Sequence, residues 1–390
     1  MPTAITKARI VTPDETIDRG TIVIGDDGRI TEVGADVTPA PGASVTTATG
    51  LTIVPGFIDL HVHGGGGFSL ATRDASEIES YARWVVRQGV TSFLATIFAD
   101  DLEEALGFVR VAAERAGPIT DGATPLGLHL EGPFVNADRR GALPESWITD
   151  ADPRTFDGMV QGAAGHLRVM TVAPELPRAA DISRKALSLG IVVAIGHTDA
   201  GYDVALRAFE AGASHVTHAF NAMRPFHHRD PGPVGAAIQS QHVTVEVVAD
   251  GVHLHPATID LLIRSLGPDR VVLTTDAVTP AGLSAGSFRV GREEARLEDG
   301  RMLLPDGTIA GSAATMDQLV RNVVEWGFVG IADAVRMATI VPARVIGLSS
   351  SKGRVAPGFD ADLVALNSDL GVVMTWIGGE LACRRGLNET

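Results

Sequence analysis

The segment Phe57-Ile-Asp-Leu-His-Val-His63, followed by four glycines at positions 64–67, has the pattern of a buried β-strand that ends in two histidines. Alternate residues of a strand point to the same face. Strict alternation places Phe57, Asp59, His61 and His63 on one face and Ile58, Leu60 and Val62 on the other. The glycines would let the backbone approach a ligand closely. The segment therefore predicts the first strand of a metal-bearing β/α barrel.

The composition excludes several classes of protein. The chain has 390 residues, of which 45% are hydrophobic and 20% charged, so it can bury a large core. Its single cysteine, Cys383, excludes an internal disulfide and any cysteine-rich metal site, so a metal would be held by histidine and carboxylate. A net charge of −15 argues against nucleic acid and acidic membrane surfaces as partners. No apolar run reaches the roughly 18 residues that span a bilayer and no signal peptide is recognisable, so we expect a cytoplasmic protein.

The order of the segments predicts an α/β fold. Short strands are expected near the N-terminus at residues 4–11, 20–24 and 29–33, with a hairpin turn at Asp26-Asp27-Gly28. From residue 53 onward, strands alternate with amphipathic helices; in the first helix Asp74 and Glu77 suggest a capping box and Gly89 a stop. Eight strand candidates lie at residues 57–63, 90–96, 125–131, 167–173, 191–197, 214–218, 243–249 and 270–276. This pattern predicts a (β/α)8 TIM barrel with its active site at the carboxyl ends of the strands.

The remaining segments complete the predicted domain plan. Residues 286–311 interrupt the last βα unit as a polar hairpin, helices are expected near 316–326 and 331–346, and strands return at 361–366 and 372–377. We therefore expect a small β-sandwich domain formed by both chain ends, at residues 1–52 and 357–390. The metal-dependent barrel, at residues 53–356, would be inserted between them.

Polar residues end several of the predicted barrel strands. The strand Pro125-Leu-Gly-Leu-His-Leu-Glu131 turns His129 and Glu131 away from its leucines, and three later strands end in His197, His218 and Asp276. A buried, unpaired carboxylate or imidazole is costly, and a divalent metal satisfies several such groups at once. A carboxylate, two histidines and a water form a zinc-type catalytic site with an open position.

Six motifs lie at or near these strand ends: Pro55-Gly-Phe-Ile-Asp-Leu-His-Val-His-Gly-Gly-Gly-Gly67, His129-Leu-Glu-Gly-Pro-Phe134, Gly196-His-Thr198, Thr217-His-Ala-Phe-Asn-Ala-Met223, Ala249-Asp-Gly-Val-His253 and Thr275-Asp-Ala277. Together with Gly311-Ser312, Thr315-Met316 and Met337-Ala-Thr-Ile-Val-Pro-Ala-Arg344, they extend over nearly the whole chain. In this combination the sequence resembles the N-acetylglucosamine-6-phosphate deacetylases of the amidohydrolase superfamily.

The resemblance implies a metal-dependent hydrolase that converts N-acetylglucosamine 6-phosphate to glucosamine 6-phosphate and acetate. It implies Glu131, His197 and His218 as ligands of a divalent metal, zinc by expectation, and Asp276 as the catalytic acid/base. His61 and His63 are able to hold a second ion, and His129 either polarises the amide carbonyl or only packs. The residues implied to hold the sugar phosphate and line the sugar pocket are Ala142, Asn221, Ala222, Arg229, His253, Ile309, Ala310 and Gly311. The loop that carries Arg229 reaches a neighbouring subunit in the family, so a homodimer is expected.

Two alternatives stay open. The family usually carries a histidine where this chain has Leu143, two residues after Gly141, so the enzyme could act on another N-acetylhexosamine phosphate. A different amidohydrolase, such as a deaminase, would use similar His and Asp residues, although Arg229 with His253 favours a phosphorylated substrate. The predicted strand 167–173 has no lysine, which argues against the subclass that bridges two metals with a carboxylated lysine. A non-catalytic sugar-phosphate binder would be expected to have lost a ligand or Asp276.

Overall fold

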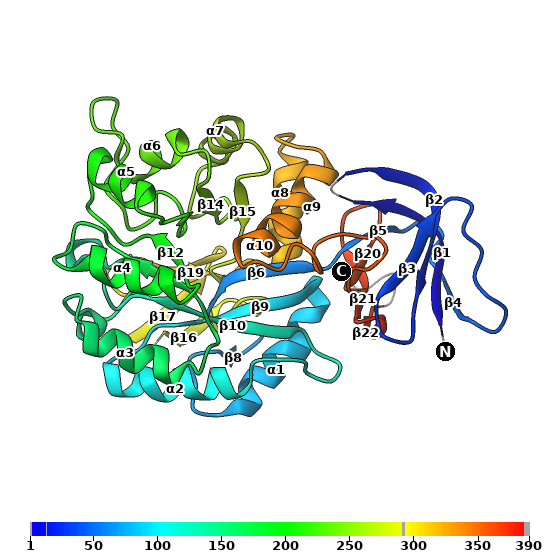
Figure 1. Ribbon diagram of the computed structural model, residues 1–390, viewed down its shortest axis with the longest axis horizontal. Helices are drawn as coiled ribbons and strands as arrows, with labels where there is room; N and C mark the ends of the chain where they lie inside the picture. Colours follow the sequence, from blue (N-terminus) through cyan, green and yellow to red (C-terminus); the bar gives the residue numbers. More distant parts are fainter. Residues whose placement is uncertain (1, 13, 291–292, 386–390) are drawn as a thin grey trace.

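A barrel of parallel strands forms the larger part of the molecule in the computed structural model, which describes residues 2–12, 14–290 and 293–385 (Figure 1). Its eight strands lie side by side in chain order. They are β6 (Phe57–Val62), β9 (Val90–Ile97), β10 (Thr124–Glu131), β11 (Leu167–Val172), β12 (Val192–Ile195), β13 (His215–Val216), β14 (Thr244–Val247) and β15 (Val271–Leu273). The predicted (β/α)8 barrel is confirmed.

The barrel closes between its last and first strands, beside the predicted site residues His61, His63 and Asp276. The backbone N–H of Asp276 donates to the carbonyl of His61 at 2.9 Å, and that of His63 donates to the carbonyl of Ala277 at 2.8 Å. A parallel bridge between Val62 and Ala277 completes the closure. The first and last strands therefore hold His61, His63 and Asp276 against one another.

Helices cover the barrel, seven of them between successive strands and three after the last strand (Figure 1). They are α1 (Ala75–Val85), α2 (Leu102–Glu114), α3 (Pro153–Gly162), α4 (Ala179–Ser188), α5 (Tyr202–Glu210), α6 (Gly232–Gln239), α7 (Pro256–Leu266), α8 (Met316–Glu325), α9 (Ile331–Ala338) and α10 (Ile340–Val345). None of these helices is long and apolar enough to cross a membrane.

The predicted alternation of β6 is wrong in part. Ile58 and Leu60 pack in a cluster with Ile340 and Val341 of α10, whereas Phe57 and Val62, expected on opposite faces, both join the main core. The register of β6 against β9 shifts between Phe57 and Ile58 and again between Asp59 and Val62. Such irregularities rotate the side chains that follow them, and a strict period of two does not survive.

The start of α1 also differs from its prediction. Asp74 caps the helix as expected, because its side chain accepts from the backbone N–H of Ser76. Glu77, however, accepts from the N–H of Ser69, and the N–H of Asp74 donates to Thr72. The reciprocal half of a capping box is therefore absent, and Glu77 instead ties the glycine loop to the helix.

The segment between β15 and α8 forms a small antiparallel sheet over the barrel mouth. Its strands are β16 (Gly286–Val290), β17 (Glu293–Glu298), β18 (Arg301–Leu303) and β19 (Ile309–Ser312). The predicted turns at Asp299-Gly300 and Gly307 have positive φ angles. The N–H of Ser312 donates to the carbonyl of Asp276 at 2.7 Å, so β19 is fixed to the end of the eighth barrel strand.

Both chain ends contribute to the second domain, which lies beside the barrel (Figure 1). Its sheet has the order β22-β21-β20-β5-β1-β2-β3, with β4 paired to β1. The strands are β1 (Thr3–Val11), β2 (Thr16–Ile24), β3 (Ile30–Gly34), β4 (Ser44–Thr47), β5 (Thr52–Pro55), β20 (Leu363–Leu366), β21 (Val372–Ile377) and β22 (Glu380–Arg384). The predicted small β-sandwich domain of both termini agrees with this arrangement, although β5 runs past the expected boundary at residue 52.

Candidate metal centre

The residues predicted to bind metal meet at the carboxyl ends of the barrel strands. Glu131 ends β10, and His61 lies near the end of β6. His63 follows β6, and His197, His218 and Asp276 follow β12, β13 and β15. The φ angles of the last three are +46°, +25° and +49°. A non-glycine residue rarely adopts a positive φ, and such strain persists where the surrounding structure holds it, often at functional sites. These bends turn the three side chains back toward the barrel axis.

One group of potential ligands consists of Glu131, His197 and His218. The Nε2 atoms of His197 and His218 lie 3.0 and 3.1 Å from Oε1 of Glu131 and 3.0 Å from each other. All three side chains are buried. A tetrahedral ion with bonds of about 2.0–2.1 Å would separate its ligand atoms by about 3.4 Å, so the group is close to the spacing of a metal site.

A second group consists of His61, His63 and Asp276. The two Nε2 atoms are 3.2 Å apart, and they lie 3.5 and 3.3 Å from Oδ1 of Asp276. Glu131 lies between the groups, because its Oε2 is 3.4 Å from Nε2 of His63 while its Oε1 faces His197 and His218. The carboxylate of Glu131 is therefore placed to bind an ion in each group.

The hydrogen bonds behind the histidines test whether a cation fits. Nδ1 of His197 lies 2.9 Å from the carbonyl of Arg139, which can only accept, so Nδ1 carries the proton. In the ring that carries only this proton, the lone pair of Nε2 points at an oxygen of Glu131. Acceptors facing acceptors at 3.0 Å repel unless a cation lies among them. The donor set of imidazole nitrogen and carboxylate oxygen suits zinc and similar divalent ions.

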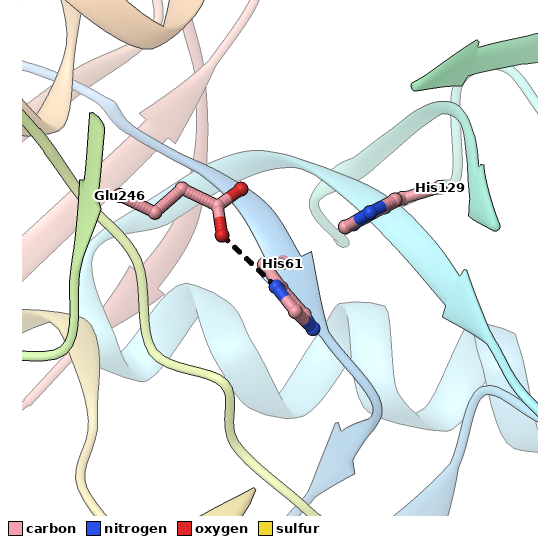
Figure 2. A group of neighbouring side chains, drawn as sticks. All are labelled: His61, His129 and Glu246. Carbon is pink, nitrogen blue, oxygen red and sulfur yellow. Dashed lines mark hydrogen bonds and ion pairs between the residues drawn. The ribbon is translucent and has the colours of Figure 1, made fainter. Parts of the chain in front are cut away.

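Glu246 is a residue that the sequence reasoning missed. It lies in the middle of β14, completely buried, and its Oε2 is 3.0 Å from Nδ1 of His61 (Figure 2). Burial alone would raise the pKa of Glu246, but the charge of His61 and the hydrogen bonds from His215 and His61 hold it well below the usual value. The available signal was a carboxylate inside the otherwise aliphatic run Thr244-Val-Glu-Val247 of a predicted barrel strand.

His129 lies beside His61 rather than in the substrate space. It is fully buried, its Nε2 is 2.8 Å from the hydroxyl of Thr171, and its ring meets that of His61 edge to face. Burial and the neighbouring His61 lower its pKa to about 3, so it is neutral. His129 does not line the cavity that is bounded by His63, Glu131 and Asp276. The packing role left open by the sequence fits these surroundings better than contact with an amide.

A cavity of about 380 Å³ lies directly above the two groups. Glu131, His63, His197, His218 and Asp276 form its floor. Its walls include seven residues that the sequence predicted for the sugar phosphate, namely Ala142, Asn221, Ala222, His253, Ile309, Ala310 and Gly311. Leu143, the departure from the family pattern, also lines the cavity and is 4% exposed.

Two polar groups face each other in this cavity. Burial alone would raise the pKa of Asp276, but the neighbouring His61 and His63 lower it to about 2, so the carboxylate is ionised at neutral pH. Nε2 of His253 is 3.8 Å from Oδ2 of Asp276, and its Nδ1 is 2.7 Å from Asp250. Although burial opposes its charge, the hydrogen bond to Asp250 raises the pKa of His253.

Arg229 is the one predicted substrate residue that lies elsewhere. It belongs to an exposed turn bridged by His227 and Asp230, and its guanidinium is 2.8 Å from Nε2 of His228. The cavity lining formed by the described residues contains no arginine or lysine. Nearby Arg139 and Arg224 are paired with Asp199. Among the residues that the structure describes, none therefore brings a guanidinium to the wall of this cavity.

Comparison with known proteins gives one consistent result. The sequence model of the Amidohydrolase family matches residues 52–382. The N-acetylglucosamine-6-phosphate deacetylase of Bacillus subtilis (strain 168) is 35% identical, with 96% of this chain and 95% of that protein covered. The N-acetylgalactosamine-6-phosphate deacetylase of Escherichia coli O157:H7 is 34% identical, covering 96% and 97%. A solved mutant of N-acetyl-D-glucosamine-6-phosphate deacetylase from Mycobacterium smegmatis, in complex with N-acetyl-D-glucosamine-6-phosphate, has a TM-score of 0.90 at 35% identity, with 98% and 99% coverage.

Proposed function

This chain belongs to the amidohydrolase family, and on that premise we propose that it removes the acetyl group from N-acetylglucosamine 6-phosphate. The products are glucosamine 6-phosphate and acetate. The observation that carries the proposal is the convergence of Glu131, His197, His218, His63 and Asp276 at the floor of one cavity, with the buried His61 in contact with them. Relatives and solved structures with this activity, which cover nearly the whole chain, support it.

We assign one divalent ion, zinc by preference, to Glu131, His197 and His218. A second ion would take His61, His63 and Asp276, with Glu131 shared between the two groups. When bound there, a divalent cation supplies Lewis-acid chemistry, which activates water and polarises an amide carbonyl.

Asp276 is the residue assigned to proton transfer. Its low pKa makes it an ionised base, and its position on the cavity floor places it beside the reacting amide. It takes a proton from the attacking water as the new carbon–oxygen bond forms. It returns that proton to the amine nitrogen when the carbon–nitrogen bond breaks, so the leaving group departs as a neutral amine.

The sugar is assigned to the cavity walls, with Asn221 and His253 as polar contacts and Ile309 to Gly311 along one side. The phosphate is assigned to Arg229, whose guanidinium can bind two phosphate oxygens at once. Because Arg229 does not line the cavity of its own chain, we infer that it reaches the cavity of a second copy in a homodimer. A cytoplasmic location, expected from the sequence, stays a prediction.

The function is tested by acetate release from N-acetylglucosamine 6-phosphate, together with elemental analysis of protein purified without added metal. We expect stoichiometric acetate, loss of activity after chelation and recovery with a divalent ion. Nucleosides serve as the deaminase control. Ammonia release from a nucleoside, without acetate release from any N-acetylhexosamine phosphate, would replace the proposal with the deaminase alternative.

N-acetylgalactosamine 6-phosphate is the second candidate substrate. A relative with that activity is 34% identical, close to the 35% of the N-acetylglucosamine-6-phosphate enzyme. Leu143 adds an apolar contact where a hydroxyl would be recognised. The ratio of kcat/KM for the two sugars decides between them.

Replacing Arg229 by Ala tests the phosphate assignment. We expect kcat/KM for the phosphorylated sugar to fall by the equivalent of about 1.5–3 kcal/mol, with little change for the unphosphorylated sugar. The control is Arg264→Ala, because Arg264 is exposed on α7 and pairs only with Asp260. Equal losses on both sugars would show that Arg229 does not read the phosphate.

A further inference from the structure

A buried carboxylate beneath the cavity touches both groups of metal ligands. Glu246 is completely buried in β14 and does not line the cavity. A buried charge is costly unless hydrogen bonds satisfy it. Its Oε2 lies 3.0 Å from Nδ1 of His61 (Figure 2). The same oxygen lies 3.0 Å from the backbone nitrogen of His218, and Oε1 lies 3.0 Å from Nε2 of His215. Three groups therefore point at one carboxylate.

The identity of the donors follows from the chemistry of each group. The backbone N–H of His218 can only donate. An ionised carboxylate can only accept, so Nδ1 of His61 and Nε2 of His215 must carry protons. Nδ1 of His215 is 2.7 Å from the hydroxyl of Thr244, which also lies 3.3 Å from the carbonyl of Ser214. In their neutral forms, both imidazoles therefore have a defined tautomer, with the proton on Nδ1 of His61 and on Nε2 of His215.

The tautomer of His61 decides where its lone pair points. With the proton on Nδ1, the bare Nε2 faces His63 and Asp276 at 3.2 and 3.5 Å. His63 and His218 lack this support, since Nδ1 of each has no partner among the described residues. In metal sites, a carboxylate behind a ligating histidine commonly fixes the ring and raises its basicity.

The bond to His218 has a different consequence. His218 has a φ of +25°, a strained conformation for a residue with a side chain. This bend turns its Nε2 toward Glu131 and His197. A charge-assisted bond from the N–H of His218 to Glu246 holds the bend in place.

We propose that Glu246 is a positioning residue that couples the two metal-ligand groups, by fixing the Nδ1–H tautomer of His61 and by holding the strained backbone at His218. The inference rests on the metal centre of the proposed function. It does not depend on which substrate is hydrolysed.

Two variants separate the contributions of Glu246. In Glu246→Gln the amide oxygen can still accept from His61 and His218, and the amide NH2 can donate to His215 once that ring moves its proton to Nδ1. In Glu246→Leu both acceptors are lost at similar volume. The control is Asp317→Leu, which removes another buried carboxylate, one that is bonded to Thr315 and Arg321 and not to a metal ligand.

Metal affinity is measured by titrating the chelated proteins with Zn²⁺ in metal buffers. We expect Glu246→Leu to lose about 10–100-fold in affinity, Glu246→Gln to lose less, and Asp317→Leu to match the wild type. Unchanged affinity in a folded Glu246→Leu protein overturns the proposal. An equal loss in Asp317→Leu also overturns it, because general destabilisation would then be the cause.

Two measurements on the metal-free protein do not require activity. Long-range ¹H–¹⁵N NMR should report the Nδ1–H tautomer for His61 in the wild type and in Glu246→Gln, and a mixture in Glu246→Leu. Amide exchange at His218 should be faster in Glu246→Leu. If the Leu protein fails to fold, an Nε2–H tautomer of His61 in the wild type still refutes the proposal. Failure to release acetate would count against the proposed function alone.

Discussion

At the scale of single residues, the backbone of Asp276 is fixed on both sides. Its N–H donates to the carbonyl of His61 and its carbonyl accepts from the N–H of Ser312, so the backbone that carries the carboxylate has little freedom. Replacement by Asn keeps the shape but cannot transfer a proton. We expect kcat to fall by at least about 10²-fold.

The same variant separates catalysis from metal binding. Because Asp276 belongs only to the group with His61 and His63, Asp276→Asn should retain the ion at Glu131, His197 and His218. Elemental analysis of the purified variant, against the wild type, checks this. Activity close to the wild type would show that Asp276 has been given the wrong role.

Leu143 carries the prediction about specificity. Its side chain is nearly buried in the cavity wall and offers no hydrogen bond to a sugar hydroxyl. An apolar wall discriminates by about 1–3 kcal/mol at most, whereas a site built to hydrogen-bond a hydroxyl rejects analogues more strongly. We expect kcat/KM to differ little among the 6-phosphates of N-acetylglucosamine, N-acetylgalactosamine and N-acetylmannosamine, and Leu143→His to widen the differences. A wild type strictly selective for one sugar, with the same selectivity in the variant, would contradict this.

At the scale of elements, β19 positions the catalytic residue from above. Gly311 has a φ of +74°, and a Cβ there would lie 2.6 Å from Cγ1 of Val278 and 2.9 Å from the carbonyl oxygen of Asp276. Gly311→Ala should therefore move Asp276 and lower kcat by roughly 10–100-fold.

Gly300 is the matched control for Gly311, because it has the same φ of +74° and no atom within 4 Å of the added Cβ. Gly300→Ala should lose about 1–2 kcal/mol of stability from backbone strain and keep its kcat. Equal kcat values for the two variants would rule out this role of β19.

The elements also show what the sequence could and could not predict. The eight barrel strands were found because each is a short, largely apolar run at a regular interval, and several of these runs end in a polar residue, as in the run that ends at Glu131. The helix expected at 331–346 breaks at Thr339, whose φ of −134° and ψ of −83° are not helical. Its hydroxyl bonds the carbonyl of Val335 and no apolar period marks the break. Glu246 was missed for a related reason, since its partners His61 and His215 come from other strands and only the closed barrel brings them together.

At the scale of the whole molecule, the barrel and the terminal domain meet around Lys352. The side chain of this lysine is only 13% exposed, and its Nζ lies 2.6 Å from Asp362 and 3.2 Å from Asp360. Asp362 also accepts from the N–H of Gly378, and its carbonyl accepts from Gly56 at the entry to the first barrel strand. One ion-pair cluster therefore joins the loop after α10, the start of β20 and the passage from β5 to β6.

The pH dependence of stability provides the test of this joint. Although burial opposes its charge, Asp362 and Asp360 raise the pKa of Lys352 above its usual value of 10.5. A group with a raised folded-state pKa stabilises the fold fully below the unfolded-state value and loses that contribution as the pH rises through the folded-state value. Lys352→Met should thus lower the free energy of unfolding by about 1.5–3 kcal/mol at pH 8, and the difference from the wild type should shrink as the pH rises past 10.5 and through the raised pKa of the folded state. Urea unfolding across this range measures both.

The control is Arg184→Met, which removes an exposed ion pair with Asp181. The Arg184 side chain is 76% exposed, so this variant should lower the free energy of unfolding by less than about 1 kcal/mol at any pH in the range. If Lys352→Met behaves like Arg184→Met, the cluster does not hold the two domains together.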